Sequence, residues 1–262
     1  MHLLTWIILF CLLGGFLSVL AASSFLLLPE GLRNRLLPHF VSFAIGALLG
    51  AAFLALIPHS LTGLVSGDFH VIGLTILLGI LGFFLLEKMV LWRHCHSDHC
   101  EAHTPQEAFE QGSAKSTVSI ILLGDGLHNF VDGVLIGAAF LTDIHLGIVT
   151  SLAVAAHEIP QEVGDFAILL HSGMQRKKAL LLNIFSGLVT VLGGVLAYFS
   201  LGDATEIIPF VLAIAASSFI YIAVADLIPD LHKQTMFKES MQQITLITMG
   251  VLVIYIAHST LH

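Results

Sequence analysis

The chain has 262 residues, of which 56% are hydrophobic and only 11% are Asp, Glu, Lys or Arg. A soluble domain usually carries about a quarter charged residues, so this composition indicates a membrane protein. The formal net charge of −8 disfavours nucleic acid as a partner, because a nucleic-acid binder normally presents a basic surface. At roughly 20 apolar residues per span, the length suffices for about eight helices. We expect an all-α polytopic protein in which 1–262 form a single transmembrane domain within the lipid bilayer.

Apolar segments recur along the whole chain, and their lengths suit membrane-spanning helices. We predict eight spans, over 3–28, 40–63, 70–92, 116–141, 146–171, 179–201, 207–229 and 242–260. The first segment resembles a signal peptide near Ala21 and Ala22, but its apolar run is too long and no basic residue precedes it. We therefore expect it to be retained as a span.

Basic residues lie only at alternate connections, and such residues accumulate on the cytoplasmic side of a membrane. All ten lie at the connections that follow the first, third, fifth and seventh spans: Arg33, Arg35, Lys88, Arg93, Lys115, Arg176, Lys177, Lys178, Lys233 and Lys238. The other connections carry acidic residues, among them Asp68, Asp143 and Asp203. With an even number of spans, this bias predicts that both termini lie outside.

A short internal echo suggests an inverted repeat. The tripeptide Leu-Ile-Pro ends the second span at 56–58 and the seventh span at 227–229, on opposite sides of the membrane. Transporters often consist of inverted repeats with the binding site at the repeat interface. We expect the second and seventh spans to be such counterparts.

Ionisable residues gather in the fourth span, where they are costly unless they face the bundle interior and pair with something. Asp125, His128 and Asp132 are spaced i, i+3, i+7 and therefore share one face of a helix. Asn129 lies at the edge of that face.

The fifth span carries polar faces of its own. Glu158, Glu162 and Asp165 share one stripe of the helix. His157 and Gln161 form a second stripe, about 100° away. Both stripes are expected to face the polar residues of the fourth span.

A short turn near Asp143 makes these two spans adjacent and antiparallel. His128 precedes the turn by 15 residues and His157 follows it by 14, so both lie about 20 Å from it at about 1.5 Å per residue. Neither span contains Lys or Arg. Protonation would relieve part of the cost of the buried acids, and a divalent cation is the other solution. His with Asp or Glu is a ligand set favoured by zinc and accepted by iron(II) and manganese.

Two motifs, HNFVDG at 128–133 and HEIPQEVGDF at 157–166, resemble those of the ZIP (Zrt/Irt-like) divalent metal transporters. The whole chain also fits the family's plan of eight helices with both termini outside. The resemblance implies a paired metal centre midway through the membrane, formed by His128, Asn129, Asp132, His157, Glu158 and Gln161, with Glu162 nearby. Many relatives have Glu in place of Asp132, and His or Glu in place of Gln161. The neutral amide at 161 predicts that one of the two subsites is weak.

Further ligands are expected along the metal pathway, at Asp125, Asp165, Asp226 and His59. The resemblance makes Asp226 an exit ligand toward the inner side, although it also suits a simple membrane-interface residue. His59 follows Pro58 near the outer mouth.

The connection 93–115 is expected to be a cytoplasmic His/Cys-rich loop. Its candidate metal ligands are His94, Cys95, His96, His99, Cys100 and His103. Imidazole and thiolate together bind zinc. The resemblance implies a loop that receives or senses metal without forming part of the pathway, and a solvated flexible loop is the alternative.

The sequence thus predicts a transporter, not an enzyme, that moves a divalent metal toward the cytoplasm. Zinc is the expected substrate, with Fe2+ or Mn2+ as alternatives, and no other cofactor is expected. A membrane metal sensor would bind without flux. An intramembrane metal-dependent hydrolase is disfavoured, because a zinc-protease helix needs a second His where Gln161 stands. We expect a bacterial inner membrane location, and a homodimer stays open.

Overall fold

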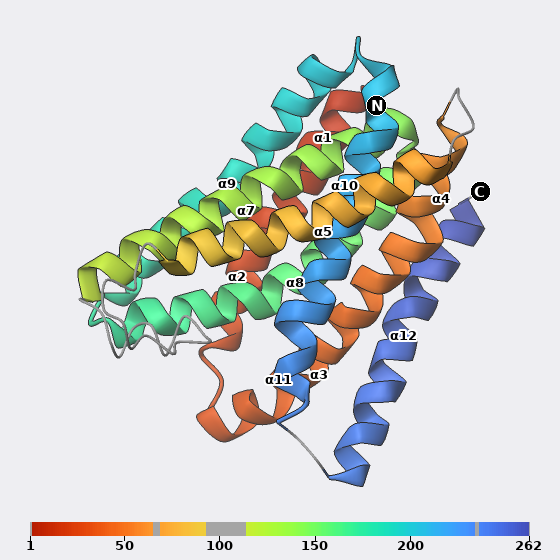
Figure 1. Ribbon diagram of the computed structural model, residues 1–262. Coiled ribbons are helices and arrows are strands. Elements are labelled where there is room, and N and C mark those ends of the chain that lie inside the picture. Colours follow the sequence, from red (N-terminus) through yellow and green to blue (C-terminus); the bar gives the residue numbers. More distant parts are fainter. Residues whose placement is uncertain (1, 65–68, 93–113, 234–235, 262) are drawn as a thin grey trace.

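The computed structural model describes residues 2–64, 69–92, 114–233 and 236–261, and every regular element in them is a helix (Figure 1). The elements are α1 Leu3–Leu12, η1 Leu13–Leu17, α2 Ser18–Phe25, α3 Glu30–Ala51, η2 Ala52–Leu56, α4 Ile57–Thr62, α5 Phe69–Trp92, α7 Ala114–Thr142, α8 Ile144–His171, α9 Arg176–Leu201, η3 Thr205–Ile207, α10 Ile208–Tyr221, η4 Ile222–Leu227, α11 Ile228–Leu231 and α12 Phe237–Leu261. The prediction of an all-α fold is confirmed.

Within the described ranges, consecutive elements join into eight rods, because three of them continue through π-helical turns. The first rod is α1–η1–α2, the second is α3–η2–α4 and the seventh is α10–η4–α11. Seven of the described rods are long and apolar enough to cross a membrane. The remaining one, α8, has 28 residues, or about 42 Å of helix, but polar residues lower its hydropathy. The molecule is therefore a polytopic membrane protein, as predicted.

Some predicted boundaries were wrong. The second and eighth helices begin at Glu30 and Phe237, not at 40 and 242, because polar first turns continue into the apolar helix and hydropathy detects only the apolar part. The fourth helix begins at Ala114, so the last two residues of the predicted loop are helical.

The two Leu-Ile-Pro tripeptides adopt the same local structure. In each, a π-helical turn ends at the Leu, and an α-helix begins at the Ile with the Pro in its first turn. A proline ring collides with the carbonyl four residues earlier in an α-helix, and the extra residue of a π turn relieves this crowding. The two rods run in opposite directions (Figure 1), and η2 contacts α10 while η4 contacts α3. The two Leu-Ile-Pro tripeptides therefore occupy matching segments of two antiparallel rods.

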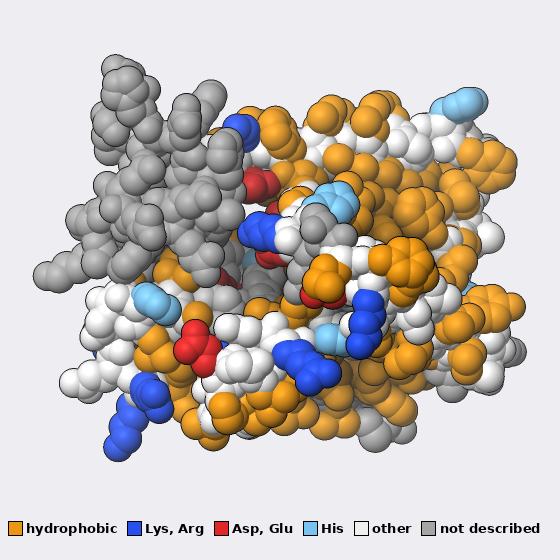
Figure 2. All heavy atoms as spheres, turned by 90° about the horizontal axis from the view of Figure 1, so that it is seen from below, with side chains coloured by type: hydrophobic (Ala, Val, Ile, Leu, Met, Phe, Trp, Pro, Cys, Tyr) orange, Lys and Arg blue, Asp and Glu red, His pale blue; other side chains and the backbone are white. Residues whose placement is uncertain are grey.

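Both chain ends lie at one end of the bundle, which we call the terminal end (Figure 1). The opposite end, which we call the basic end, displays Lys and Arg side chains (Figure 2). Large apolar side chains are exposed along the sides, for example Leu77 and Leu81 on α5 and Phe185 on α9. Such a surface suits a lipid bilayer. The basic end is the predicted cytoplasmic side.

α8 runs through the middle of the bundle, in contact with α2, α3, α7, α9 and α12. Its start is fixed by Asp143, whose Oδ1 accepts hydrogen bonds from the backbone N–H groups of His145 at 2.8 Å and Leu146 at 3.0 Å. This N-cap makes the turn from α7 into α8 tight. The two helices therefore run side by side in opposite directions, as predicted.

α7 and α9 approach each other backbone to backbone. A Cβ atom at Gly133 would collide with the carbonyl of Thr190, and one at Gly193 would collide with the carbonyl of Phe130. Small residues permit such close approach within membranes. As a result, polar side chains of α9 reach the polar face of α7.

Candidate metal centre

Four side chains from α7 and α8 converge in the middle of the bundle. His128 and Asp132 come from α7, and His157 and Glu158 come from α8. Each offers one ligand atom, and these four atoms all lie within 4.8 Å of one another. The depth count from the turn at Asp143 is therefore correct, because it places the two histidines at the same level.

The separations of these atoms suit a single tetrahedral ion. The Nε2 atoms of the two histidines lie 3.2 Å apart, and Asp132 Oδ2 lies 3.2 Å from Nε2 of His157 and 3.7 Å from Nε2 of His128. Glu158 Oε1 lies 3.4 Å from Nε2 of His128 and 3.7 Å from Nε2 of His157. Zinc bonds of about 2.0–2.1 Å in a tetrahedron separate the ligands by about 3.3 Å. The side chains therefore need little movement to hold zinc.

The ring of His157 is held in a ligand-ready orientation. Its Nδ1 lies 3.1 Å from the carbonyl oxygen of Ala153, and because a carbonyl only accepts, Nδ1 is the donor. Nε2 of the neutral ring then carries the lone pair that faces the cluster. The ring of Phe219 on α10 packs edge-on against it, with centroids 6.1 Å apart.

The two acidic residues of the cluster are buried, and none of the described Lys or Arg side chains forms an ion pair with them. The side chains of Asp132 and Glu158 are at most 1% exposed, and none of their four oxygens makes a regular hydrogen bond. Among the described residues, the two carboxylates form ion pairs only with His128 and His157. Buried charges of one sign need compensation. A divalent cation would balance the two carboxylates.

Asn129, a predicted ligand, is engaged beside the cluster. Its Nδ2 donates to Oδ1 of Asp125 at 2.9 Å, and its Oδ1 accepts from Oγ1 of Thr190 at 2.7 Å. The side chain thus ties α7 to α9, and metal binding by Asn129 stays a prediction. Thr190 was missed by sequence reasoning. Its signal is the spacing Asn183, Ser186, Thr190, which repeats the i, i+3, i+7 stripe of the fourth span.

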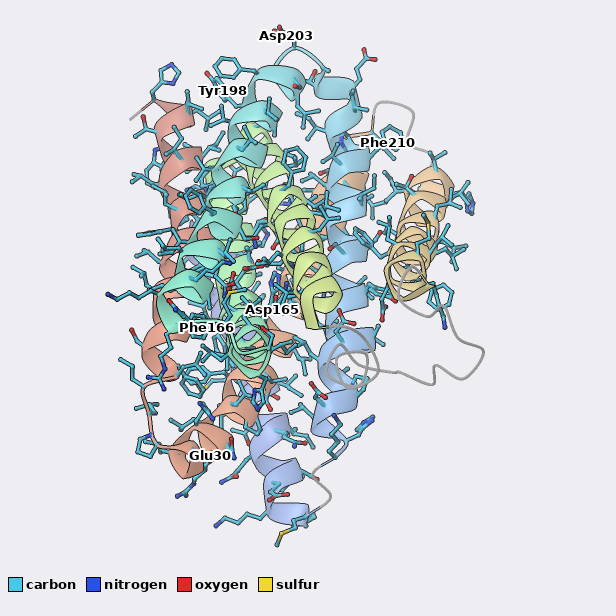
Figure 3. The ribbon with its side chains drawn as sticks, turned by 90° about the vertical axis from the view of Figure 1, so that its left-hand side faces the viewer. Glu30, Asp165, Phe166, Tyr198, Asp203 and Phe210 are labelled. Carbon is cyan, nitrogen blue, oxygen red and sulfur yellow. The ribbon has the colours of Figure 1, made fainter. Side chains whose placement is uncertain are left out.

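The other predicted residues of α7 and α8 lie toward the basic end. Asp125 and Glu162 are buried, one turn beyond His128 and Glu158, respectively. Gln161 is half-buried, one turn beyond His157. Figure 3 shows Asp165 between Asp203 at the terminal end and Glu30 at the basic end, in the half nearer the basic end.

The remaining predicted ligands lie away from the cluster. Asp226 is exposed within η4. His59 lies near the terminal end, where Nδ1 is 2.9 Å from the carbonyl oxygen of Ala55 and the ring packs against His258 of α12 with centroids 5.5 Å apart. His258 was missed, because nothing in the sequence pairs positions so far apart. The predicted ligands of the loop fall outside the described residues.

Access to the centre differs between the two ends. Toward the terminal end, almost every residue of 132–140 and 146–154 is buried. Toward the basic end, His128 is 22% exposed, and a Cβ added at Gly124 or Gly164 would have no neighbour within 4 Å. Figure 2 shows acidic side chains around a hollow in this face. The described conformation is therefore more open toward the basic end.

A helical bundle that gathers imidazoles and carboxylates about one buried point defines a membrane protein of the metal-binding, polytopic class. Residues 92–258 match the family model described as ZIP Zinc transporter, so the chain belongs to the ZIP zinc transporter family. This confirms the resemblance seen in the two motifs. It also confirms that the chain is not an enzyme, because the family is one of transporters.

Several curated relatives are zinc transporters by name. Human Zinc transporter ZIP4 is 33% identical over 261 residues, covering 78% of this chain and 40% of that protein. Zinc transporter ZIP13 of Pongo abelii is 32% identical over 229 residues, covering 83% and 65%, and human Zinc transporter ZIP10 is 38% identical over 142 residues, covering 53% and 17%. The chain thus spans less than two thirds of the length of these relatives.

Proposed function

We propose that this chain carries divalent metal ions, with zinc as the main substrate, across a membrane toward the cytoplasm. The observation that carries the proposal is the geometry of His128, Asp132, His157 and Glu158. Five distances of 3.2–3.7 Å join their ligand atoms, close to those around a tetrahedral zinc ion. The names of the relatives support zinc in particular.

The charge of the centre explains how a doubly charged ion can rest in the bilayer. The ion exchanges its water molecules for two neutral imidazoles and two carboxylates. The complex of ion and ligands is then neutral, which lowers the electrostatic cost of a low-dielectric site. Release follows when the bundle opens toward the basic end, as in the described conformation.

A paired centre remains part of the proposal, with unequal subsites. Asn129 would have to give up its hydrogen bonds to Asp125 and Thr190 before it could bind a second ion. Gln161 contributes no charge. We therefore expect one strong ion at the four-residue cluster and a weaker second one beside it.

The remaining predictions concern the loop, the domain organisation, the membrane and the oligomeric state. We propose that the predicted loop, without the helical residues Ala114 and Lys115, receives metal at the cytoplasmic side and is not needed for passage. The single-domain organisation, the bacterial inner membrane and the homodimer remain predictions.

The test is uptake of radiolabelled zinc into proteoliposomes that contain the purified protein. The double variant His157→Ala/Glu158→Ala should abolish saturable uptake, while Asp203→Asn, an exposed position at the terminal end, should leave it unchanged. Excess iron(II) and manganese in parallel assays rank the alternative substrates. If the wild type binds zinc but moves none under any gradient, the transport proposal is wrong and a metal sensor takes its place.

A further inference from the structure

A second buried polar cluster lies one helical turn from the metal centre, toward the basic end. Asp125 precedes His128 by three residues on α7, and Glu162 follows Glu158 by four on α8. Because the helices are antiparallel and His128 meets Glu158 at 3.4 Å, one turn along each reaches the same level. The two carboxylates therefore lie across from each other beneath the centre.

α9 completes this cluster with two neutral side chains. Asn183 lies beside the carboxylate of Glu162, and Ser186 lies beside that of Asp125. The helix is fixed at this level by the hydrogen bond from Thr190 to Asn129, which in turn donates to Asp125. Three helices thus supply one constellation, which we call the inner cluster: Asp125, Glu162, Asn183 and Ser186.

The inner cluster is buried and its polar atoms are poorly satisfied. The residues are 4% exposed for Asp125, 0% for Glu162, 1% for Asn183 and 5% for Ser186. Oδ2 of Asp125, both carboxylate oxygens of Glu162, both amide atoms of Asn183 and Oγ of Ser186 make no regular hydrogen bond within the described chain. Native proteins rarely bury so many unpaired polar atoms together. A packing role alone leaves them unexplained, whereas a bound cation would engage their oxygens.

The donor chemistry differs from that of the metal centre. Every available ligand atom of the inner cluster is an oxygen: three belong to the two carboxylates, one to the amide and one to the hydroxyl. Oxygen ligands suit hard divalent ions such as Mn2+, whereas imidazole favours zinc. Two carboxylates also balance the charge of one divalent ion.

We propose that the inner cluster is a further, oxygen-only cation site, which accepts the ion leaving the His centre and can bind Mn2+. Its role as an exit station rests on the proposed transport function, but its capacity to bind Mn2+ does not. Zinc that leaves the imidazoles meets a site with no nitrogen donor and passes on quickly. Mn2+ is suited to oxygen ligands and gives up little when it leaves the imidazoles, so the inner cluster contributes to the choice of substrate.

The experiment measures Mn2+ binding to purified full-length protein by the loss of the electron paramagnetic resonance signal of free Mn2+. The starting point is a His128→Ala/His157→Ala variant, which lacks the imidazoles of the first centre. We expect it to retain one Mn2+ site. Adding Glu162→Gln should weaken that site at least tenfold, and adding Ser186→Ala should weaken it a few-fold. Adding Asp203→Asn instead should change nothing.

Folding is checked by gel filtration and by thermal unfolding of every variant. Glu162→Gln keeps the shape of the side chain, and Ser186→Ala serves if the Gln variant does not fold. Mn2+ binding that disappears with the two histidines, or that survives unchanged in the Glu162→Gln and Ser186→Ala variants, overturns the inner site. If the wild type retains this Mn2+ site yet moves no metal in proteoliposomes, the transport proposal fails while the site stands.

Discussion

Gly133→Ala should destabilise the protein, because this glycine is where α7 and α9 touch. The added methyl group would collide with the carbonyl of Thr190 and lie 2.9 Å from the backbone nitrogen of Gly194. Both obstacles are backbone atoms, so no side chain can rotate away. The two helices would have to separate.

The size of the effect follows from two opposing contributions. Replacing Gly by Ala inside a helix gains about 0.8–1 kcal/mol of helix propensity. Overpacking costs about 1–3 kcal/mol, and a collision with backbone belongs at the upper end. We therefore expect a net loss of about 2 kcal/mol in the free energy of unfolding.

The same change should weaken zinc binding, since Gly133 adjoins Asp132 and lies one turn from the 2.7 Å hydrogen bond between Asn129 and Thr190. Gly124→Ala is the matched control, because its Cβ would meet nothing within 4 Å and should stabilise the helix by about 0.8–1 kcal/mol. Unfolding of the two variants in detergent, followed by zinc titration, makes the comparison. Equal stability of Gly133→Ala and Gly124→Ala would refute the reasoning.

Three further predictions concern the centre and the loop. Thr190→Val should lower the free energy of unfolding by about 1–3 kcal/mol, because it leaves the buried side-chain oxygen of Asn129 without its hydrogen-bond donor. The control Thr248→Val, on the exposed face of α12, should be nearly neutral in the same unfolding assay. Zinc at 100 times its dissociation constant should raise the free energy of unfolding of the wild type by about 2.7 kcal/mol. If the same zinc concentration raised the free energy of unfolding of His157→Ala by a similar amount, the proposal that His157 binds the ion would be contradicted. Deleting 94–112 should change zinc uptake only modestly, and complete loss in a normally expressed protein would contradict that.

Much of the metal centre could be predicted from the sequence, because it depends on short-range geometry. The spacing of His128 and Asp132 on one helix, and the nearly equal distances of His128 and His157 from the turn at Asp143, are enough to bring α7 and α8 residues together. Helix periodicity and rise are the same in every sequence. The convergence of His157 and Glu158 with them follows from that regularity.

The contribution of α9 could not be predicted in the same way. Because Asn183, Ser186 and Thr190 are uncharged, they do not stand out as candidate site residues in an apolar span. Their contact with α7 depends on the collision-free packing at Gly133 and Gly193, which only the three-dimensional structure shows. The π turns before Pro58 and Pro229 were invisible for a related reason, since hydropathy does not report an extra residue in a helical turn.

The distribution of contacts limits how the centre can change its access. All four residues of the candidate metal centre come from α7 and α8, and α9 is locked to α7 through glycines, so these helices hold the site as one group. α3 and α12 are locked to each other in the same manner, since a Cβ at Gly46 would collide with the carbonyl of Ile247. The two groups meet where α8 contacts α3 and α12. Under the proposed transport function, sliding or rocking at that contact would preserve the geometry of the four candidate ligands while it exchanges one open end for the other, whereas separation of α7 from α8 would release the ion at once.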